Sequence, residues 1–352
     1  MCSGPVGTGI FIIFLFRSSC FLRNEMAFVR SKNRQPFEKA ARLQVNPVCL
    51  RIRLMDDSDF RGVFPPMITP FTEQGEVDYD AFVFNIEKWN GTGLSGYLVM
   101  GSNSETTFLT EDEKLELIRL TVEAADPAKK IVVGTGLESI SETIRLTNQA
   151  ARLGAECALL LTPYFYGYEM TSAALVSYYR ECADHCDIPV LIYNVPKFTH
   201  VNIQADAVHE LASHPNIIGM KDSAGDVAQV ATFLRETPDD FAIAVGTASI
   251  WYPALTLGIR TGVHALANCC PDEDVSVQTA YEKGDWQTAL DTYQRLFPVN
   301  AIVTGSLGVA ALKYACDLMG YRGGYVRQPL QPIDDAQKKT IRAVLSQAGL
   351  LA

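Results

Sequence analysis

Short apolar runs rich in valine, isoleucine and leucine recur along the chain from residue 61 onward. Successive runs begin 21 to 35 residues apart, at Gly62, Gly96, Ile131, Cys157, Ile188, Ile217, Phe241 and Gly262. Continuous apolar runs of this kind are typical of strands that are buried on both faces, as in parallel sheets. The pattern therefore predicts eight buried strands.

Amphipathic helical patterns separate these runs. Two of them open with the spacing of a capping box, in which a serine or threonine is followed three residues later by a glutamate: Thr110 with Glu113, and Ser139 with Glu142. On the first of these, Leu115, Ile118 and Val122 share one face, as a helix packed on a core requires. The helices predicted between the strands include 110–125, 139–153, 171–185 and 203–213.

Strand and helix alternate through eight units, which predicts an α/β fold of the TIM (β/α)8 barrel type. A doubly wound sheet is the alternative, but it usually has fewer strands. After residue 270 the pattern is helical, over 272–297, 299–318 and 334–350. We therefore expect one domain, with a (β/α)8 barrel over 56–270 and a C-terminal helical extension over 271–352 that packs on the outside of the barrel.

The N-terminal segment, residues 1–55, has a different composition. Its apolar run at 9–16 is too short to span a bilayer, and residues 17–54 are rich in arginine and poor in acids. That composition fits a transit peptide, and a start at Met55 explains the segment equally well. The sequence favours a cytoplasmic protein, with a mitochondrial location as the alternative, and residues 1–55 are left out of the fold prediction.

The charge of the chain limits its partners. Residues 1–54 carry nine Lys or Arg and two acids, a net charge of +7, so the total of −10 leaves −17 for residues 55–352. An acidic body argues against nucleic acid as a partner, since phosphate binding needs a basic surface. The nine cysteines include no C-x-x-C pair, which fits a reducing compartment better than a disulfide framework.

Two polar residues end apolar runs at the edge where a barrel carries its active site. Lys221 follows NIIGM in the sixth run, and Tyr193 lies two residues after Leu191 in the fifth, so both are expected to face the barrel axis. A neutral amine in a partly dehydrated mouth can form an imine with a ketone, and a phenol beside it can shuttle protons. Taken singly, a lysine reaching solvent and a capping aromatic are the commoner explanations.

Other strand ends give weaker indications. The turn Gly101, Ser102, Asn103 and Ser104 offers N–H and hydroxyl groups that can hold a carboxylate, although such residues are also ordinary in turns. Gly246 permits close approach of the backbone at the end of the seventh run. The histidines show no metal-binding spacing, no nucleotide-binding glycine motif occurs, and we expect neither a metal nor an organic cofactor.

Together, these motifs resemble the dihydrodipicolinate synthase / N-acetylneuraminate lyase superfamily of class I aldolases, from about Arg61 to about Pro332. The resemblance rests on an ordered set of short motifs: PMITPF in the 65–71 region, GSNSE at 101–105, TPYFY at 162–166, YNVP at 193–196 and GMKDS at 219–223. Each motif alone is modest, but their order and the 28-residue gap from Tyr193 to Lys221 are specific.

The resemblance implies roles for individual residues. Lys221 corresponds to the imine-forming lysine, Tyr193 to the proton-shuttling tyrosine, and Ser102 with Asn103 to the group that binds the carboxylate of a 2-oxo acid. Members of the superfamily usually form tetramers of paired dimers, so we expect a homotetramer or a homodimer. Their substrates are small 2-oxo acids, and no membrane partner is implied.

Three positions depart from the superfamily pattern. Phe165 replaces the tyrosine that reaches the neighbouring site, although Tyr164 and Tyr166 flank it. Ser104 replaces a glycine, so the turn must avoid a positive φ there. Phe198 stands where dihydrodipicolinate synthases carry an arginine that binds the carboxylate of aspartate semialdehyde, which weakens a role in lysine biosynthesis.

Within the superfamily, the sequence is expected to be nearest to 4-hydroxy-2-oxoglutarate aldolase, on the basis of HPNIIGMKDSAGD at 214–226, SAAL at 172–175 and the late pattern at 312–331. Ser223 is then a substrate contact, and Lys197, Phe198 and Thr247 shape the aldehyde pocket. The predicted reaction cleaves a 4-hydroxy-2-oxo acid to pyruvate and an aldehyde. Dihydrodipicolinate synthase (4-hydroxy-tetrahydrodipicolinate synthase), a 2-keto-3-deoxy sugar-acid aldolase or dehydratase, and a non-catalytic barrel are the alternatives.

Overall fold

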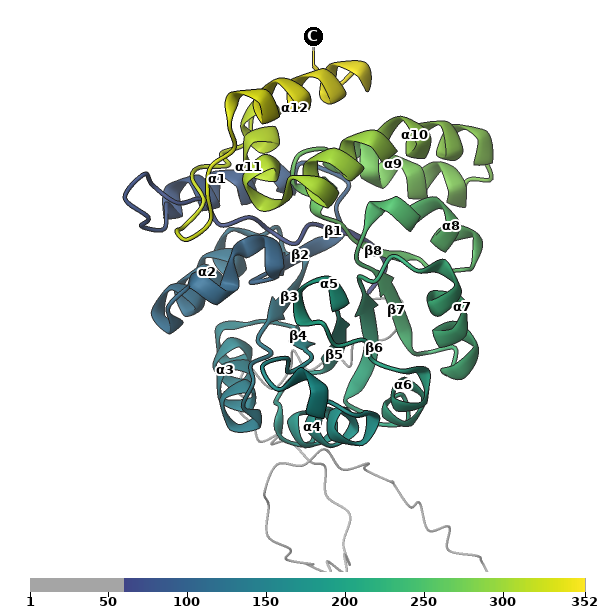
Figure 1. Ribbon diagram of the computed structural model, residues 1–352. Coiled ribbons are helices and arrows are strands. Elements are labelled where there is room, and N and C mark those ends of the chain that lie inside the picture. Colours follow the sequence, from purple (N-terminus) through teal and green to yellow (C-terminus); the bar gives the residue numbers. More distant parts are fainter. Residues whose placement is uncertain (1–59, 352) are drawn as a thin grey trace, which may run out of the picture. The chain divides into compact units, whose positions relative to one another are not determined.

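The computed structural model describes residues 60–351, and the predicted N-terminal extension lies outside them. Eight short parallel strands form one sheet (Figure 1). The strands are β1 (Gly62–Phe64), β2 (Gly96–Val99), β3 (Lys130–Gly134), β4 (Cys157–Leu161), β5 (Val190–Asn194), β6 (Ile217–Asp222), β7 (Ala242–Val245) and β8 (Thr261–Val263).

The order of the strands is that of a barrel. Neighbours follow β1-β8-β7-β6-β5-β4-β3-β2, and every pairing is parallel. The gap between β1 and β2 is bridged just beyond β1, where Met67 N donates to Leu98 O at 2.9 Å and Leu98 N donates to Pro65 O at 3.1 Å. The predicted (β/α)8 barrel is confirmed.

The barrel has two cores because successive strand residues point to opposite faces. The interior is filled by a small apolar cluster that includes Phe60, Phe64, Leu159 and Leu191. A larger cluster packs the outward strand residues against the surrounding helices. The filled interior leaves polar side chains to the carboxyl ends of the strands, where a barrel carries its active site.

Helices alternate with the strands, as the amphipathic patterns predict. They are α1 (Tyr79–Asn90), α2 (Glu111–Ala124), α3 (Ile140–Leu153), α4 (Ser172–His185), α5 (Pro196–Thr199), α6 (Ala205–Leu211), α7 (Val227–Glu236) and α8 (Trp251–Thr256). The capping box of Thr110 and Glu113 is present at the start of α2.

The second capping-box prediction is wrong. Ser139 precedes α3 but makes no capping bond, because its hydroxyl pairs with Ser141 Oγ at 2.9 Å. Glu142 instead lies 2.6 Å from Arg145 Nη2 on the exposed face of the helix. The ion pair draws the Glu142 carboxylate away from the helix start, which the serine–glutamate spacing alone does not reveal.

The C-terminal helices are more broken than predicted. The stretch 272–297 is two helices, α9 (Pro271–Glu282) and α10 (Trp286–Val299), because Gly284 has a φ of +79° and Asp285 caps the second helix. The stretch 299–318 is a π-helical segment, η7 (Asn300–Ser306), followed by α11 (Gly308–Leu318). Helix α12 (Asp335–Gln347) is the last helix of residues 60–351, and α9 to α12 gather on the β1 and β8 side of the barrel (Figure 1).

Residues 60–351 lie within one compact unit, so the C-terminal helices belong to the same body as the barrel. Among the helices of residues 60–351, none is long and apolar enough to cross a membrane.

Candidate active site at the carboxyl ends of the strands

Tyr193 and Lys221 lie side by side on adjacent strands. They are register partners in the β5–β6 ladder, and the Lys221 Nζ lies 4.2 Å from the centre of the Tyr193 ring. Both side chains are buried, with exposed fractions of 6% for Tyr193 and 3% for Lys221. Sequence periodicity predicts this pairing, and the ladder holds the amine and the phenol within reach of one small substrate.

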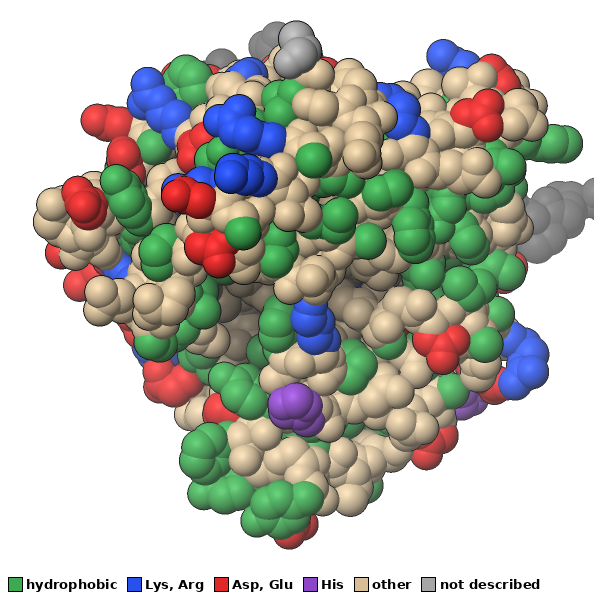
Figure 2. Space-filling model, turned by 45° about the horizontal axis from the view of Figure 1, so that its top comes forward, with side chains coloured by type: hydrophobic (Ala, Val, Ile, Leu, Met, Phe, Trp, Pro, Cys, Tyr) green, Lys and Arg blue, Asp and Glu red, His purple; other side chains and the backbone are tan. Residues whose placement is uncertain are grey.

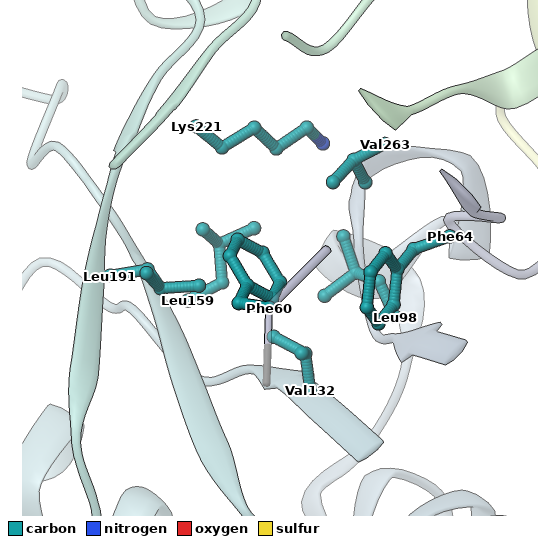
Figure 3. Close-up of a pocket in the computed structure, with 8 residues that line it drawn as sticks. All are labelled: Phe60, Phe64, Leu98, Val132, Leu159, Leu191, Lys221 and Val263. Atoms are coloured by element: carbon teal, nitrogen blue, oxygen red, sulfur yellow. The ribbon is translucent and has the colours of Figure 1, made fainter. Parts of the chain in front are cut away.

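Lys221 lies across the top of an apolar cavity inside the barrel. Figure 3 shows its amine pointing toward Val263. The cavity is lined by Phe60, Phe64, Leu98, Val132, Leu159, Leu191, Lys221 and Val263. An apolar floor excludes water from beneath the amine. In the space-filling view the surface is hollowed near the middle of the face shown, with hydrophobic side chains around the hollow (Figure 2).

The predicted carboxylate-binding turn reaches the same place. Residues Ser102–Ser104 form one turn of 3-10 helix, η2, directly after β2. Ser102 Oγ lies 3.2 Å from the Tyr193 hydroxyl, and either group can be the donor. The hydrogen bond joins the β2 turn to the β5 strand end, so the structure brings Ser102, Tyr193 and Lys221 together.

Ser104 avoids the positive φ that its position in the motif suggested. It lies within the 3-10 turn, and its hydroxyl donates to Met67 O at 2.5 Å. The left-handed conformation falls on the next residue, Glu105, whose φ is 55°. The serine is therefore accommodated without strain, and the strain is carried by a buried glutamate.

Ser223 and Gly246 complete the wall beside the lysine. The Ser223 hydroxyl is buried and has no hydrogen-bond partner among the described residues, so it is available to a ligand. A Cβ atom on Gly246 would lie 1.8 Å from Ser223 Oγ and 3.0 Å from Lys221 Cε. Gly246 is required at this position because any larger residue would displace both side chains. The hydroxyl of Thr247, the next residue, accepts from Ser249 N at 3.3 Å.

Sequence reasoning missed a polar network behind the strand ends. Asn194 and Asp222, the register partners beyond Tyr193 and Lys221, are both fully buried, and Asn194 Nδ2 donates to Asp222 Oδ1 at 2.7 Å. Gln229 Nε2 donates to the same oxygen at 3.1 Å. Burial raises the pKa of Asp222, although these donors partly oppose the shift. The network fixes the two strand ends relative to each other.

Lys197 lies at the rim of the site and connects two of its segments. It lies on α5, after β5, and its Nζ donates to Gly305 O in η7 at 2.9 Å. Segment η7 packs on η5 (Ala248–Ile250) and η6 (Ala265–Asn268), which follow β7 and β8. The bond thus joins rim segments that flank β6, the strand of Lys221. Phe198 beside it is 57% exposed.

The segment after β4 exposes four aromatic side chains, Tyr164, Phe165, Tyr166 and Tyr168, and Phe165 is 72% exposed. Glu138 holds the segment by accepting from Tyr164 N and Phe165 N at 3.1 Å.

Within residues 60–351, no group of three or more His, Cys, Asp or Glu side chains is arranged to hold a metal ion.

Comparison with known proteins gives the family. The model of the dihydrodipicolinate synthetase family matches residues 59–348. The chain belongs to this family. A 4-hydroxy-tetrahydrodipicolinate synthase of Methanothrix thermoacetophila is 34% identical over 82% of this chain and 96% of the relative, and one of Methanoculleus marisnigri is 33% identical over 82% and 100%. The structure of a dihydrodipicolinate synthase from Acinetobacter baumannii in complex with pyruvate matches with a TM-score of 0.79 and 27% identity, over 83% of this chain and all of that one.

Membership of the dihydrodipicolinate synthetase family confirms that the chain is an enzyme, a pyruvate-dependent lyase of the class I aldolase type. The expectation of a 4-hydroxy-2-oxoglutarate aldolase is wrong, because relatives similar over most of the chain are named 4-hydroxy-tetrahydrodipicolinate synthase. Of the stretches behind that expectation, 214–226 surrounds Lys221 on β6, whereas 172–175 begins α4 and 312–331 starts within α11. The likeness in these stretches therefore did not identify the reaction.

Proposed function

We propose that this enzyme condenses pyruvate, held as an imine on Lys221, with an aldehyde that carries its own amine, in the reaction of a 4-hydroxy-tetrahydrodipicolinate synthase. The pairing of Tyr193 with Lys221 carries the proposal, because it sets an amine 4.2 Å from the ring of a phenol at the mouth of the barrel. The names of the relatives support this choice of reaction.

The first step attaches pyruvate to the enzyme. The Ser102 and Asn103 N–H groups open the 3-10 turn, so no carbonyl within the turn accepts from them, and they bind the pyruvate carboxylate. The Lys221 amine attacks C2, and loss of one water gives the imine. Tyr193 and Ser102, 3.2 Å apart, move the protons that this step requires.

The second step forms the carbon–carbon bond. Loss of a proton from C3 gives an enamine, whose C3 attacks the aldehyde carbon, and the Tyr193 phenol protonates the resulting alkoxide. The amine of the aldehyde substrate then attacks C2 and expels the Lys221 amine, which closes the ring. Lysine is regenerated, one water leaves overall, and no electron donor or acceptor is needed. The unpartnered Ser223 hydroxyl is a further contact for the substrate.

Recognition of the aldehyde differs from the pattern of the synthases that this sequence resembles. Phe198 replaces their arginine, and the neighbouring cation, Lys197, lies on the rim. We propose that Lys197 binds the carboxylate of the aldehyde. Phe198 also favours a second candidate, an aldehyde without that carboxylate, as in a 2-keto-3-deoxy sugar-acid aldolase.

We propose a cytoplasmic homotetramer or homodimer. The exposed aromatic segment at 164–168 supports self-association, because a contiguous exposed aromatic surface is typical of interfaces. In such an assembly, Tyr164 or Tyr166 takes the place of the hydroxyl that Phe165 lacks.

The proposal is tested by trapping the imine. The parent enzyme and Lys221→Ala are incubated with pyruvate and borohydride, and the intact mass is measured. We expect a pyruvyl adduct on the parent and none on the variant. Product analysis with aspartate semialdehyde then identifies the condensation. Absence of an adduct on the folded parent refutes the imine, and an adduct without condensation product refutes the choice of aldehyde.

A further inference from the structure

A buried ion pair ties the carboxylate-binding turn to the C-terminal helices. Glu105 ends the turn, and its Oε1 lies 2.5 Å from the Nζ of Lys313 on α11. The two side chains are each 1% exposed. Burying two charges is costly and is tolerated only where each charge is compensated, so the position of one partner depends on the other.

The contacts of Glu105 fix both of its carboxylate oxygens. While Oε1 faces Lys313, Oε2 accepts from the backbone N–H of Arg327 at 2.8 Å. Glu105 also has a φ of 55°, an unfavourable conformation for a residue with a side chain, and it joins η2 to the next 3-10 turn, Thr106–Phe108. A strained junction persists only where its surroundings hold it, and here the C-terminal segment does so.

Lys313 is itself held in one position. Its Nζ donates to Tyr325 O at 2.5 Å and lies 4.5 Å from the centre of the Phe71 ring. The segment carrying Tyr325 approaches α11 closely, since a Cβ atom on Gly323 would lie 2.0 Å from Lys313 O. Burial lowers the pKa of Lys313 to about 8, and the charge of Glu105 opposes that shift. The ammonium is therefore desolvated, and Glu105 is the carboxylate that it faces.

We infer that Lys313 is a positioning residue for pyruvate binding. It does not touch the substrate. Through Glu105 it holds the turn so that the Ser102 and Asn103 N–H groups face the pyruvate carboxylate. The inference rests on the proposed function, because it takes this turn to be the pyruvate site. It assigns the C-terminal helices, distant in sequence, a part in substrate affinity.

The test separates affinity from turnover. In Lys313→Met, Glu105 loses its cation in a buried site, and the turn relaxes. We expect the pyruvate concentration that gives half-maximal imine trapping to rise roughly tenfold or more, which corresponds to the loss of about one charge-assisted contact. The turnover number at saturating pyruvate is expected to fall by a smaller factor than the affinity, since Tyr193 and Lys221 are held by strand register and only Ser102 of the proton relay lies on the turn.

Asn85→Ala is the matched control. Asn85 is fully buried on α1 and anchors the same C-terminal segment, by donating to Arg322 O and accepting from Arg322 N, each at 2.8 Å. None of these contacts involves the turn. We expect this variant to lower the thermal midpoint and to leave half-saturation by pyruvate unchanged. If Lys313→Met and Asn85→Ala shift half-saturation equally, Lys313 has only a general structural role and the inference is overturned.

Two further variants keep the test decisive if Lys313→Met does not fold. Glu105→Gln retains an acceptor for Arg327 N but removes the charge, and it should raise half-saturation by several fold. Lys313→Arg keeps the charge and should recover most of the parent affinity. Parent-like half-saturation in Glu105→Gln refutes the inference. An adduct missing from the parent itself refutes the proposed function instead, so the two failures are distinct.

Discussion

The β5–β6 strand pair and the turn after β2 hold the two halves of the proposed site in different ways. Tyr193 and Lys221 are register partners in a parallel ladder, and Asn194 and Asp222 pair immediately beyond them. Their separation is set by the backbone of adjacent strands. Residues on such elements are placed more accurately than residues on loops.

The turn depends on contacts that are remote in sequence. A single 3-10 turn carries Ser102 and Asn103, and the following residue, Glu105, is compensated by Lys313 on α11. No strand register fixes this turn. The difference suggests that substitutions at the strand pair should reduce turnover, whereas substitutions in the support of the turn should reduce the affinity for pyruvate. Each of the following predictions probes that division.

The largest effect in this comparison is expected from Tyr193→Phe. Removal of the hydroxyl eliminates the proton donor, and loss of a general acid or base typically lowers turnover by about a hundredfold or more. Half-saturation by pyruvate should change by less than about threefold, since the turn loses only its bond to the Tyr193 hydroxyl and is still held through Glu105. Steady-state kinetics and borohydride trapping measure the two quantities. A variant with normal turnover would remove Tyr193 from the chemistry.

The hydrogen bond between Ser102 and Tyr193 joins the two regions, so a double-mutant cycle sharpens this prediction. If the two hydroxyls act as one relay, Ser102→Ala should lower turnover much less in the Tyr193→Phe background than in the parent. Additive effects on turnover would mean that Ser102 acts only in binding.

The strands are also the elements that the sequence predicts best. Each predicted strand start lies within two residues of the observed one, and the largest difference is Ile188 against Val190 at β5. Strands that are buried on both faces must be apolar, so their sequence is conspicuous. Alternation along the strand then places Tyr193 and Lys221 inside the barrel, where the structure has them.

The support of the turn could not be predicted in this way. In the sequence, Lys313 occupies an ordinary polar position of the amphipathic helix α11, and Glu105 lies in a segment that the pattern assigns to a loop. Only their pairing in three dimensions makes them buried. The reaction was predicted wrongly because the stretch around Lys221 did not distinguish cleavage from condensation. The rim residues Lys197 and Phe198 lie on α5, a helix of four residues that is too short to show a periodic pattern.

A smaller effect is expected at the rim. In Lys197→Ala the proposed partner of the aldehyde carboxylate is lost, so KM for aspartate semialdehyde should rise about tenfold, the size of one partly exposed charge-assisted contact. Half-saturation by pyruvate should not change, and Lys197→Arg should retain most of the affinity. An unchanged KM for the aldehyde in Lys197→Ala would favour a substrate without that carboxylate.

The smallest effect concerns stability and comes from Asp222→Asn. Burial raises the pKa of Asp222 in the native state above its ordinary value of 3.8, which applies to the unfolded state. At pH values between the unfolded-state pKa and the native-state pKa, the native state therefore binds more protons than the unfolded state. The stability of the parent should therefore fall as the pH rises through the native pKa. Asparagine cannot ionise, so the variant should gain stability relative to the parent over that interval. Urea unfolding from about pH 4 to about pH 8 measures the difference.

Asp222→Asn and Glu105→Gln form a matched pair of neutralising substitutions, one behind each half of the site. The amide at 222 still accepts from Asn194 and Gln229, and the β5–β6 ladder is unchanged, so pyruvate half-saturation and turnover should stay within about threefold of the parent. In Glu105→Gln the neutral amide leaves Lys313 buried without a counter-charge, and pyruvate affinity should fall. Equal losses of pyruvate affinity in Asp222→Asn and Glu105→Gln would mean that the strand pair, like the turn, depends on a buried charge and not on strand register alone.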